Sequence, residues 1–257
     1  MEWNDQIFRY CERGSDPAFW AEPLNAATNA AFMIAALLAA RELARQPAGQ
    51  RGLAEGALAG LLVLMGIGSF LFHTFATRWA TYADTVPIAI FMVAYLAYAL
   101  RRFLGLGWPW VGLGLAGFIA ALKFAGEVQC GPGLLSVKSA APAACLNGTL
   151  GYVPAFLAML MIAGALVANG HPARRHFVWA SIVFLVSMTF RTVDLEICDV
   201  TRVAGHAFGT HFLWHLLNAT TLYLLATAAI RHGRSPASKT PAAKTPAADC
   251  TKAPGIA

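Results

Sequence analysis

Long apolar segments recur along the chain, and short stretches rich in polar, glycine or proline residues separate them. A helix needs about 20 apolar residues to cross the hydrocarbon core of a bilayer. Seven segments approach this length. They are Asn25–Ala40, Leu53–Phe75, Ala83–Leu100, Trp108–Phe124, Leu150–Val167, His176–Phe190 and Gly209–Ile230. The pattern therefore predicts an all-α fold, a bundle of seven transmembrane helices.

The composition agrees with this prediction. Of the 257 residues, 58% are hydrophobic and only 12% are charged, which is unlike an ordinary soluble domain. The net charge of +6 is compatible with nucleic-acid binding, but the basic residues fall in short loops and in the tail, where membrane topology places them. We therefore expect the lipid bilayer, and no nucleic acid, as a partner. The first residues are polar, acidic and aromatic, so no cleavable signal peptide is predicted.

The distribution of arginine predicts the orientation. Basic residues gather after the first, third, fifth and seventh segments. They include Arg41, Arg45, Arg51, Arg101, Arg102, Arg174, Arg175, Arg231 and Arg234. Because cytoplasmic loops carry such an excess, we expect the N-terminus outside and the C-terminus in the cytoplasm. The chain then divides into an outer segment (1–24), a membrane domain (25–231) and a tail (232–257), whose repeated KTPAA unit predicts disorder.

Polar residues that are costly to place in a membrane converge at one depth of this bundle. In the predicted orientation His73 lies near the outer end of the second segment, and Asp84 lies near the outer end of the third. His211 and His215 lie near the outer end of the seventh. His211 and His215 are four residues apart, as are Ser69 and His73, so each pair shares one helix face.

This group of residues predicts a zinc-dependent hydrolytic site. Two imidazoles four residues apart form half of a helical zinc site. A third histidine from another helix leaves one tetrahedral position open, as in catalytic zinc sites, and the zinc would activate water at neutral pH. Asp84 could transfer the proton, and Ser69 could hydrogen-bond a developing oxyanion.

Each of these residues also has a simpler interpretation. The two histidines of the seventh segment could be a packing pair. Ser69 could bond to a carbonyl one turn earlier, and Asp84 could cap the start of its helix. The convergence of all of them at one depth favours the metal site.

Four of the five cysteines fall on the predicted outer side. These are Cys11, Cys130, Cys145 and Cys198, whereas Cys250 lies in the tail. An even number suits two disulfides in an oxidising compartment. Cys130 and Cys145 bracket one loop and form an obvious pair, which would leave Cys11 for Cys198. Four free thiols are the alternative, because sequence alone does not fix connectivity.

Acidic residues also gather in the outer N-terminal segment. Glu12, Asp16 and Glu22 lie within a short polar stretch, and carboxylates with carbonyls are ligands that Ca²⁺ takes. A solvated acidic loop without a bound ion is the alternative.

Several motifs together resemble the alkaline ceramidase family, a group of seven-span zinc-dependent membrane hydrolases. The resemblance rests on YCER and FWAEPLNAATN near the start, GSFLFHTFATRWATYADTVP, RTVDLEICD, and HFLWH near the end. It implies that three histidines bind zinc, namely His73, His211 and His215. It implies that Asp84 handles the proton, that Ser69 stabilises the oxyanion and that Cys11 pairs with Cys198.

The resemblance also implies a calcium site beside the zinc. Its ligands would be Glu12 and Glu22, with the carbonyl of Tyr10. Arg9 and Gly14 depart from the family pattern, and Asp16 could compensate from a shifted position.

The function that follows is a zinc-dependent intramembrane amide hydrolase. It would cleave the N-acyl bond of ceramide or a related membrane lipid to a free fatty acid and a sphingoid base or amine. We expect a bacterial member, in the inner membrane, with its active site toward the periplasm.

Two other classes of protein remain open. A zinc-binding receptor of the adiponectin-receptor type shares the seven spans and three histidines, but its N-terminus lies inside. A proton-coupled transporter could use His and Asp as a relay. A retinal-binding protein would need a lysine in the last segment, and none lies between His206 and Ile230.

Overall fold

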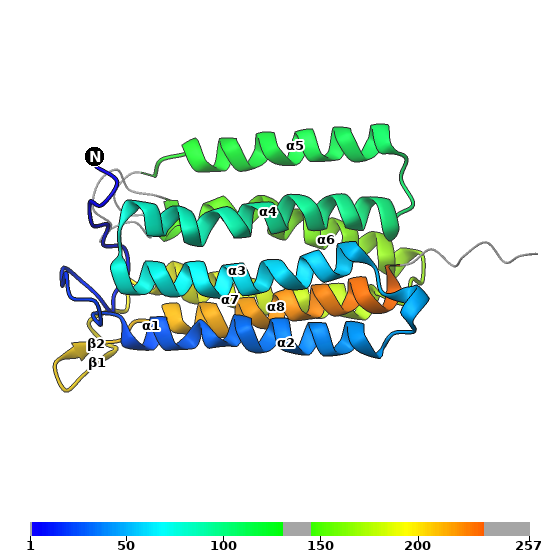
Figure 1. Cartoon of the computed structure of the whole chain (residues 1–257). Helices are drawn as coiled ribbons and strands as arrows, with labels where there is room; N and C mark the ends of the chain where they lie inside the picture. The colour runs from blue at the N-terminus through cyan, green and yellow to red at the C-terminus, as the bar shows by residue number, and fades with distance from the viewer. Residues whose placement is uncertain (1, 131–144, 234–257) are drawn as a thin grey trace, which may run out of the picture.

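The computed structural model describes residues 2–130 and 145–233 of the chain. The predicted disordered tail, apart from its first two residues, lies outside these described residues. Within them, seven helices are long and apolar enough to cross a membrane, and Figure 1 shows them side by side in one bundle. The predicted seven-helix all-α fold is confirmed, and the protein is an integral, multi-pass membrane protein.

The helices follow one another in chain order. The first span consists of α1 (Pro23–Thr28) and α2 (Ala30–Arg45), and the next three are α3 (Leu53–Phe75), α4 (Arg78–Arg102) and α5 (Trp108–Glu127). The fifth combines the 3-10 helix η2 (Cys145–Tyr152) with α6 (Val153–Ala168), and the last two are α7 (Arg174–Val193) and α8 (His211–His232). A further 3-10 turn, η1 (Ala48–Gln50), lies between α2 and α3.

Several helices extend beyond their predicted ends. The sequence predicts the sixth span as His176–Phe190, but α7 begins at Arg174 and ends at Val193. The first continues past Ala40 to Arg45. Hydropathy detects only the apolar middle of a span, whereas charged residues such as Arg174 continue the helical backbone into the polar region.

A short hairpin precedes α8. Strand β1 (Arg202–Val203) pairs antiparallel with β2 (His206–Ala207), and Ala204 and Gly205 turn between them with φ of 50° and 85°. Positive φ at both turn residues is characteristic of tight hairpins. His206 is an exposed residue of this hairpin. Figure 1 shows the hairpin and the N-terminal segment at the same end of the bundle, which we call the N-terminal end.

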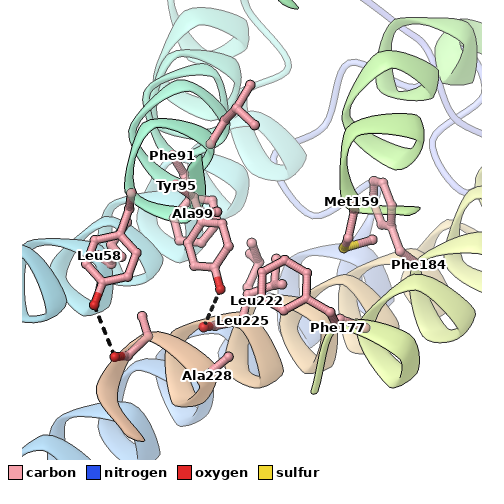
Figure 2. Packing of buried hydrophobic residues seen from close by; sticks show 14 of the residues in the cluster. Leu58, Phe91, Tyr95, Ala99, Met159, Phe177, Phe184, Leu222, Leu225 and Ala228 are labelled. Carbon is pink, nitrogen blue, oxygen red and sulfur yellow. Dashed lines mark hydrogen bonds between the residues drawn. The ribbon is translucent and has the colours of Figure 1, made fainter. Parts of the chain in front are cut away.

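The main core cluster draws chiefly on side chains from α2, α3, α4, α6, α7 and α8. The hydroxyl of Tyr95 in α4 donates a hydrogen bond to the carbonyl oxygen of Leu225 in α8, at 2.7 Å, as Figure 2 shows. In contrast, α5 lies at the edge of the bundle (Figure 1) and exposes Trp110, Ile119 and Phe124. Exposed apolar side chains of this kind are compatible with a hydrocarbon solvent.

Gly68 allows α3 and α4 to approach closely. A Cβ atom at this position would collide with the carbonyl group of Ala83 in α4. That carbonyl lacks the usual helical donor four residues on, because Pro87 has no N–H group. The close approach places Ser69, the next residue of α3, opposite Asp84 of α4.

We expect Gly68→Ala to lower the free energy of unfolding by about 1–3 kcal/mol, and with it the melting temperature, because the added methyl group must push two packed helices apart. Gly60→Ala is the matched control, since Gly60 lies on the same helix and a Cβ atom added there would have no other atom within 4 Å. Thermal unfolding in detergent measures both variants. Equal melting temperatures for the two would contradict the close contact.

Candidate metal centre

Three histidines from two helices meet at the N-terminal end of the bundle. His73 lies in the last turn of α3, and His211 and His215 lie in the first two turns of α8. Each offers one ligand atom, and these atoms all lie within 4.8 Å of one another. Among residues 2–130 and 145–233, this is the one group of three or more His, Cys, Asp or Glu residues with such geometry. The three side chains that the sequence analysis placed at one depth are therefore brought together.

The ring of His73 is oriented by a carboxylate. Its Nδ1 lies 2.5 Å from Oε2 of Glu22, and both residues are buried. A carboxylate accepts this bond from Nδ1–H, which leaves the lone pair on Nε2. Nε2 is buried and has no hydrogen-bond partner. Burial alone would raise the pKa of Glu22, but its contacts with His73, Arg13 and Asn25 lower the pKa below its ordinary value.

The ring of His215 is oriented by a hydroxyl group. Its Nδ1 lies 2.9 Å from Oγ1 of Thr28 in α1. The single hydroxyl proton of Thr28 has two carbonyl acceptors in the preceding turn, those of Leu24 at 2.9 Å and Asn25 at 3.1 Å. Nδ1 of His215 is therefore the donor to Thr28, and Nε2, which is buried without a partner, carries the lone pair.

His211 is held through its backbone and by ring stacking. The carboxylate of Asp194 accepts hydrogen bonds from the N–H groups of Thr210 (2.7 Å), His211 (2.9 Å) and Cys11 (3.0 Å). It thereby ties the start of α8 to the N-terminal segment. The ring of Tyr10 stacks on the ring of His211 with centroids 3.6 Å apart. Burial raises the pKa of Asp194, and the three N–H groups oppose that shift.

These contacts fit a bound metal ion. Three buried ring nitrogens, Nε2 of His73, Nδ1 of His211 and Nε2 of His215, have no hydrogen-bond partner. An unpaired buried polar atom costs free energy, and one cation would satisfy all three. A set of neutral imidazoles suits zinc and other transition metals.

Ser69 and Asp84 lie in the same small pocket as His211 and His215. The hydroxyl of Ser69 donates a hydrogen bond to the carboxylate of Asp84, so this serine has a partner other than the carbonyl of its own preceding turn. Asp84 lies inside α4, whose N-cap is Thr77, so it is not a helix cap. The two residues proposed for catalysis are thus adjacent to two of the three histidines.

Arg191 of α7 also lines this pocket. It donates to the hydroxyl of Tyr10 at 2.9 Å. Its guanidinium carbon lies 5.4–5.5 Å from the ring centroids of Tyr10, Tyr152 and Trp214, a distance typical of cation–π contacts. Arg191 therefore fixes the tyrosine that stacks on His211.

An apolar cavity continues from the pocket into the bundle. Met65, Ile88, Tyr152 and Asn218 line both spaces. Several of the side chains that line the cavity, from α4, α6, α7 and α8, are drawn in Figure 2. They include Phe91, Tyr95, Met159, Phe177, Phe184, Leu222 and Leu225. The metal centre is thus one end of a passage whose deeper walls are almost entirely hydrocarbon.

The residues predicted to bind calcium accept hydrogen bonds from within the chain. The carboxylate of Glu12 accepts hydrogen bonds from the N–H groups of Leu24 (2.7 Å) and Asn25 (2.8 Å) at the start of α1. Burial raises the pKa of Glu12, and these two N–H groups oppose the shift. Asp16 is exposed and bonds to the N–H group of Ala18.

The other two predicted ligands, the carbonyl of Tyr10 and the carboxylate of Glu22, also bond to donors of the chain. The carbonyl oxygen of Tyr10 accepts from the N–H group of Gly14 at 3.2 Å, and Glu22 pairs with Arg13 at 2.6 Å. Each of the four predicted ligand residues therefore already bonds to a donor of the chain itself, and the positive charge of Arg13 beside Glu22 does not suit a calcium ion.

The cysteines lie in the pairs that the sequence suggested. Cys11 is bonded to Cys198, and Cys130 is bonded to Cys145. Close to the first pair, Gly209 has a φ of 61°, and a Cβ atom there would collide with Cys11 and Asp194. The first disulfide therefore fixes the N-terminal segment against the residues that precede α8.

Comparison with known families agrees with this geometry. A family model described as Ceramidase matches residues 9–243, which is nearly the whole chain. The chain belongs to the ceramidase family. Membership in the ceramidase family identifies the protein as a hydrolase that acts on amide bonds. The apolar helices and the family together indicate a lipid substrate within the membrane. Comparisons with curated proteins and with solved structures find no match.

Sequence reasoning assigned no role to several residues that hold this ceramidase-family site. Asp194 and Arg191 belong to the motif RTVDLEICD and Arg13 to YCER, yet only the folded chain shows what they contact. Thr28 is a short polar side chain in an apolar helix, and its alignment with His215 depends on the packing of α1 against α8. A buried charged residue in a membrane protein was the available signal for Asp194 and Arg191.

We expect Thr28→Val to weaken metal binding about tenfold, because it removes the side-chain acceptor of His215 and leaves only the backbone of Asn25, while it preserves the side-chain shape. Thr28→Ser keeps the hydroxyl group and is expected to bind metal as the natural protein does. Metal content after dialysis against graded chelator concentrations distinguishes the two. Equal retention of metal by both variants would exclude this role for Thr28.

Proposed function

We propose that the protein is a zinc-dependent intramembrane amide hydrolase. It cleaves the N-acyl bond of ceramide or a related lipid and releases a free fatty acid and a sphingoid base or other amine. The observation that carries the proposal is the set of three buried, partnerless imidazole nitrogens beside a pocket that also holds Asp84 and Ser69.

In this proposal zinc is held by His73, His211 and His215. When bound, zinc supplies the Lewis acidity that polarises an amide carbonyl and makes a water molecule acidic enough to attack at neutral pH. Glu22 and Thr28 orient two of the rings, and Asp194 and Tyr10 hold the third. Such outer contacts are what keep ligands of a metal site in place.

Asp84 handles the proton. It is the carboxylate that lines the pocket with His211 and His215, so it is placed to take a proton from the attacking water and return it to the leaving amine. The hydroxyl of Ser69, which donates to Asp84, is within the same pocket. We assign Ser69 a second task, that of donating to the carbonyl oxygen of the substrate as negative charge develops there.

The apolar cavity receives a hydrocarbon chain of the lipid. Its walls bury apolar surface from α4, α6, α7 and α8, and a long acyl or alkyl chain there would place the amide at the polar end. Asn218 lines both the cavity and the pocket. Its amide can both donate and accept, so it is suited to a hydroxyl or amide group of the lipid at this junction.

The proposed location is a bacterial inner membrane, with the site toward the periplasm. The site lies at the N-terminal end of the bundle (Figure 1), and the arginine distribution predicts that this end is outside. The two disulfides suit an oxidising compartment. Calcium is not part of the proposal, because the groups predicted to bind it already bond to donors of the chain itself.

We expect Asp84→Asn to retain bound zinc but lose about 10²-fold or more of its hydrolytic rate, because the amide cannot exchange the proton. His215→Ala is the comparison, and it should lose both zinc and hydrolysis. Purified variants are assayed against ceramides and other N-acyl lipids, with released fatty acids identified by mass spectrometry and zinc by elemental analysis. An active Asp84→Asn enzyme would remove Asp84 from the mechanism, and an active His215→Ala enzyme would contradict the zinc site.

A second prediction concerns the cavity. Ala158 of α6 lines it, so Ala158→Phe should reduce hydrolysis of long-chain substrates while it spares short-chain ones, because the ring occupies the deeper space. Leu157→Phe, at an adjacent and exposed position, should leave the chain-length preference unchanged. Rates over a series of acyl lengths measure both. The same preference in the two variants would place the hydrocarbon chain elsewhere.

A further inference from the structure

Arg13 lies buried among the acceptors of the N-terminal segment. Its side chain has 0% exposure. A guanidinium group has five N–H donors, and the structure gives Arg13 five hydrogen bonds. The acceptors are Oε1 of Glu22 and the main-chain carbonyl oxygens of Asp16, Ala18, His73 and Thr74, at 2.6, 3.2, 2.9, 2.9 and 3.1 Å, respectively. Every donor of this cation is therefore used.

These acceptors form a set that would suit a metal cation. One carboxylate and four backbone carbonyls are the hard oxygen ligands that Ca²⁺ takes in proteins. In this chain they surround a guanidinium group, which carries its own positive charge and is always protonated. A calcium ion could not share these oxygens with Arg13, because both are cations and need the same lone pairs.

The contacts of Arg13 lead directly to the metal centre. Oε1 of Glu22 accepts from Arg13, and Oε2 of the same carboxylate accepts from Nδ1 of His73. Arg13 also binds the backbone carbonyls of His73 and Thr74 in the last turn of α3. The last carbonyls of a helix lack intrahelical partners, and a cation there is favoured by the helix dipole. Arg13 thus holds both the backbone and, through Glu22, the ring of one metal ligand.

We propose that Arg13 is a built-in cation that takes the structural place of a bound calcium ion and positions His73, so that the metal centre of this protein is independent of calcium. Arg13 is a positioning residue, since it acts on the three-histidine site through Glu22 and the end of α3. The catalytic consequence rests on the proposed function, whereas the calcium independence and the effect on metal binding do not.

The first test uses the purified full-length protein in detergent, depleted of calcium. For the natural protein we expect the melting temperature and the metal affinity of the three-histidine site to stay constant as Ca²⁺ is added to about 1 mM, the weak end of calcium sites in proteins. Equilibrium dialysis with radioactive calcium should show no stoichiometric binding. Stoichiometric binding accompanied by a rise in melting temperature would overturn the proposal.

The second test removes the guanidinium group. Arg13→Ala should lower the melting temperature and weaken metal binding about tenfold or more, and guanidinium ion at a few millimolar should restore both, whereas the same concentration of sodium ion should not. Arg9→Ala is the matched control, since Arg9 is an exposed arginine of the same segment. If Arg13 had only a general role in stability, added guanidinium ion would not restore the metal affinity of Arg13→Ala. Arg13→Ala behaving as Arg9→Ala, or failing to respond to guanidinium, would contradict the proposal.

Arg13→Lys covers the case in which Arg13→Ala does not fold. It keeps the charge but has three donors from one nitrogen, so metal affinity should fall while calcium still has no effect. Unchanged metal affinity in this variant would contradict the need for a guanidinium group. If the three-histidine site proves to hold no metal, or no N-acyl lipid is cleaved, the proposed function fails. The calcium response of the natural protein and the rescue of melting temperature would then still decide the role of Arg13.

Discussion

The site depends on the two hydrogen bonds of the Glu22 carboxylate, because they join the N-terminal segment to the end of α3. One oxygen binds Arg13 and the other binds His73. A buried carboxylate is tolerated only when its charge is compensated and its lone pairs are used. The cost of burying Glu22 is thus offset by the same bonds that set the orientation of a metal ligand.

The other two histidines, His211 and His215 in α8, are also oriented by polar groups from other segments of the chain. His211 and His215 share one face of α8, and their supports come from elements distant in the sequence, namely Asp194 before α8 and Thr28 in α1. The bundle brings α1, α3, α7 and α8 together at the N-terminal end, and each contributes a polar group that a neighbour needs. The polar groups of this end are therefore arranged around the three imidazoles, whereas the cavity beyond them is lined mainly by apolar side chains.

Sequence reasoning predicted the spans and the convergence of His73, His211 and His215, because both depend on periodicity and membrane depth alone. It placed the ends of the helices less well, since Arg174 and Arg45 continue helices that hydropathy ends earlier. It could not predict the hydrogen bonds of the carboxylates proposed for calcium, because a carboxylate in a sequence does not show which donor will bind it. Glu12 and Glu22 fit a calcium pattern by residue type, and only the fold shows that backbone N–H groups and a guanidinium group bind them.

The disulfide between Cys11 and Cys198 joins residues that are 187 positions apart, and this separation bears on how the protein is made. The segment that carries Arg13 and Glu22 is synthesised before α8, which supplies two of the three histidines. A nascent chain that has not yet inserted its final helix has no metal site to close. The three-histidine site can therefore form only after both segments have been made, and a chain released before α8 would lack two of its three histidines.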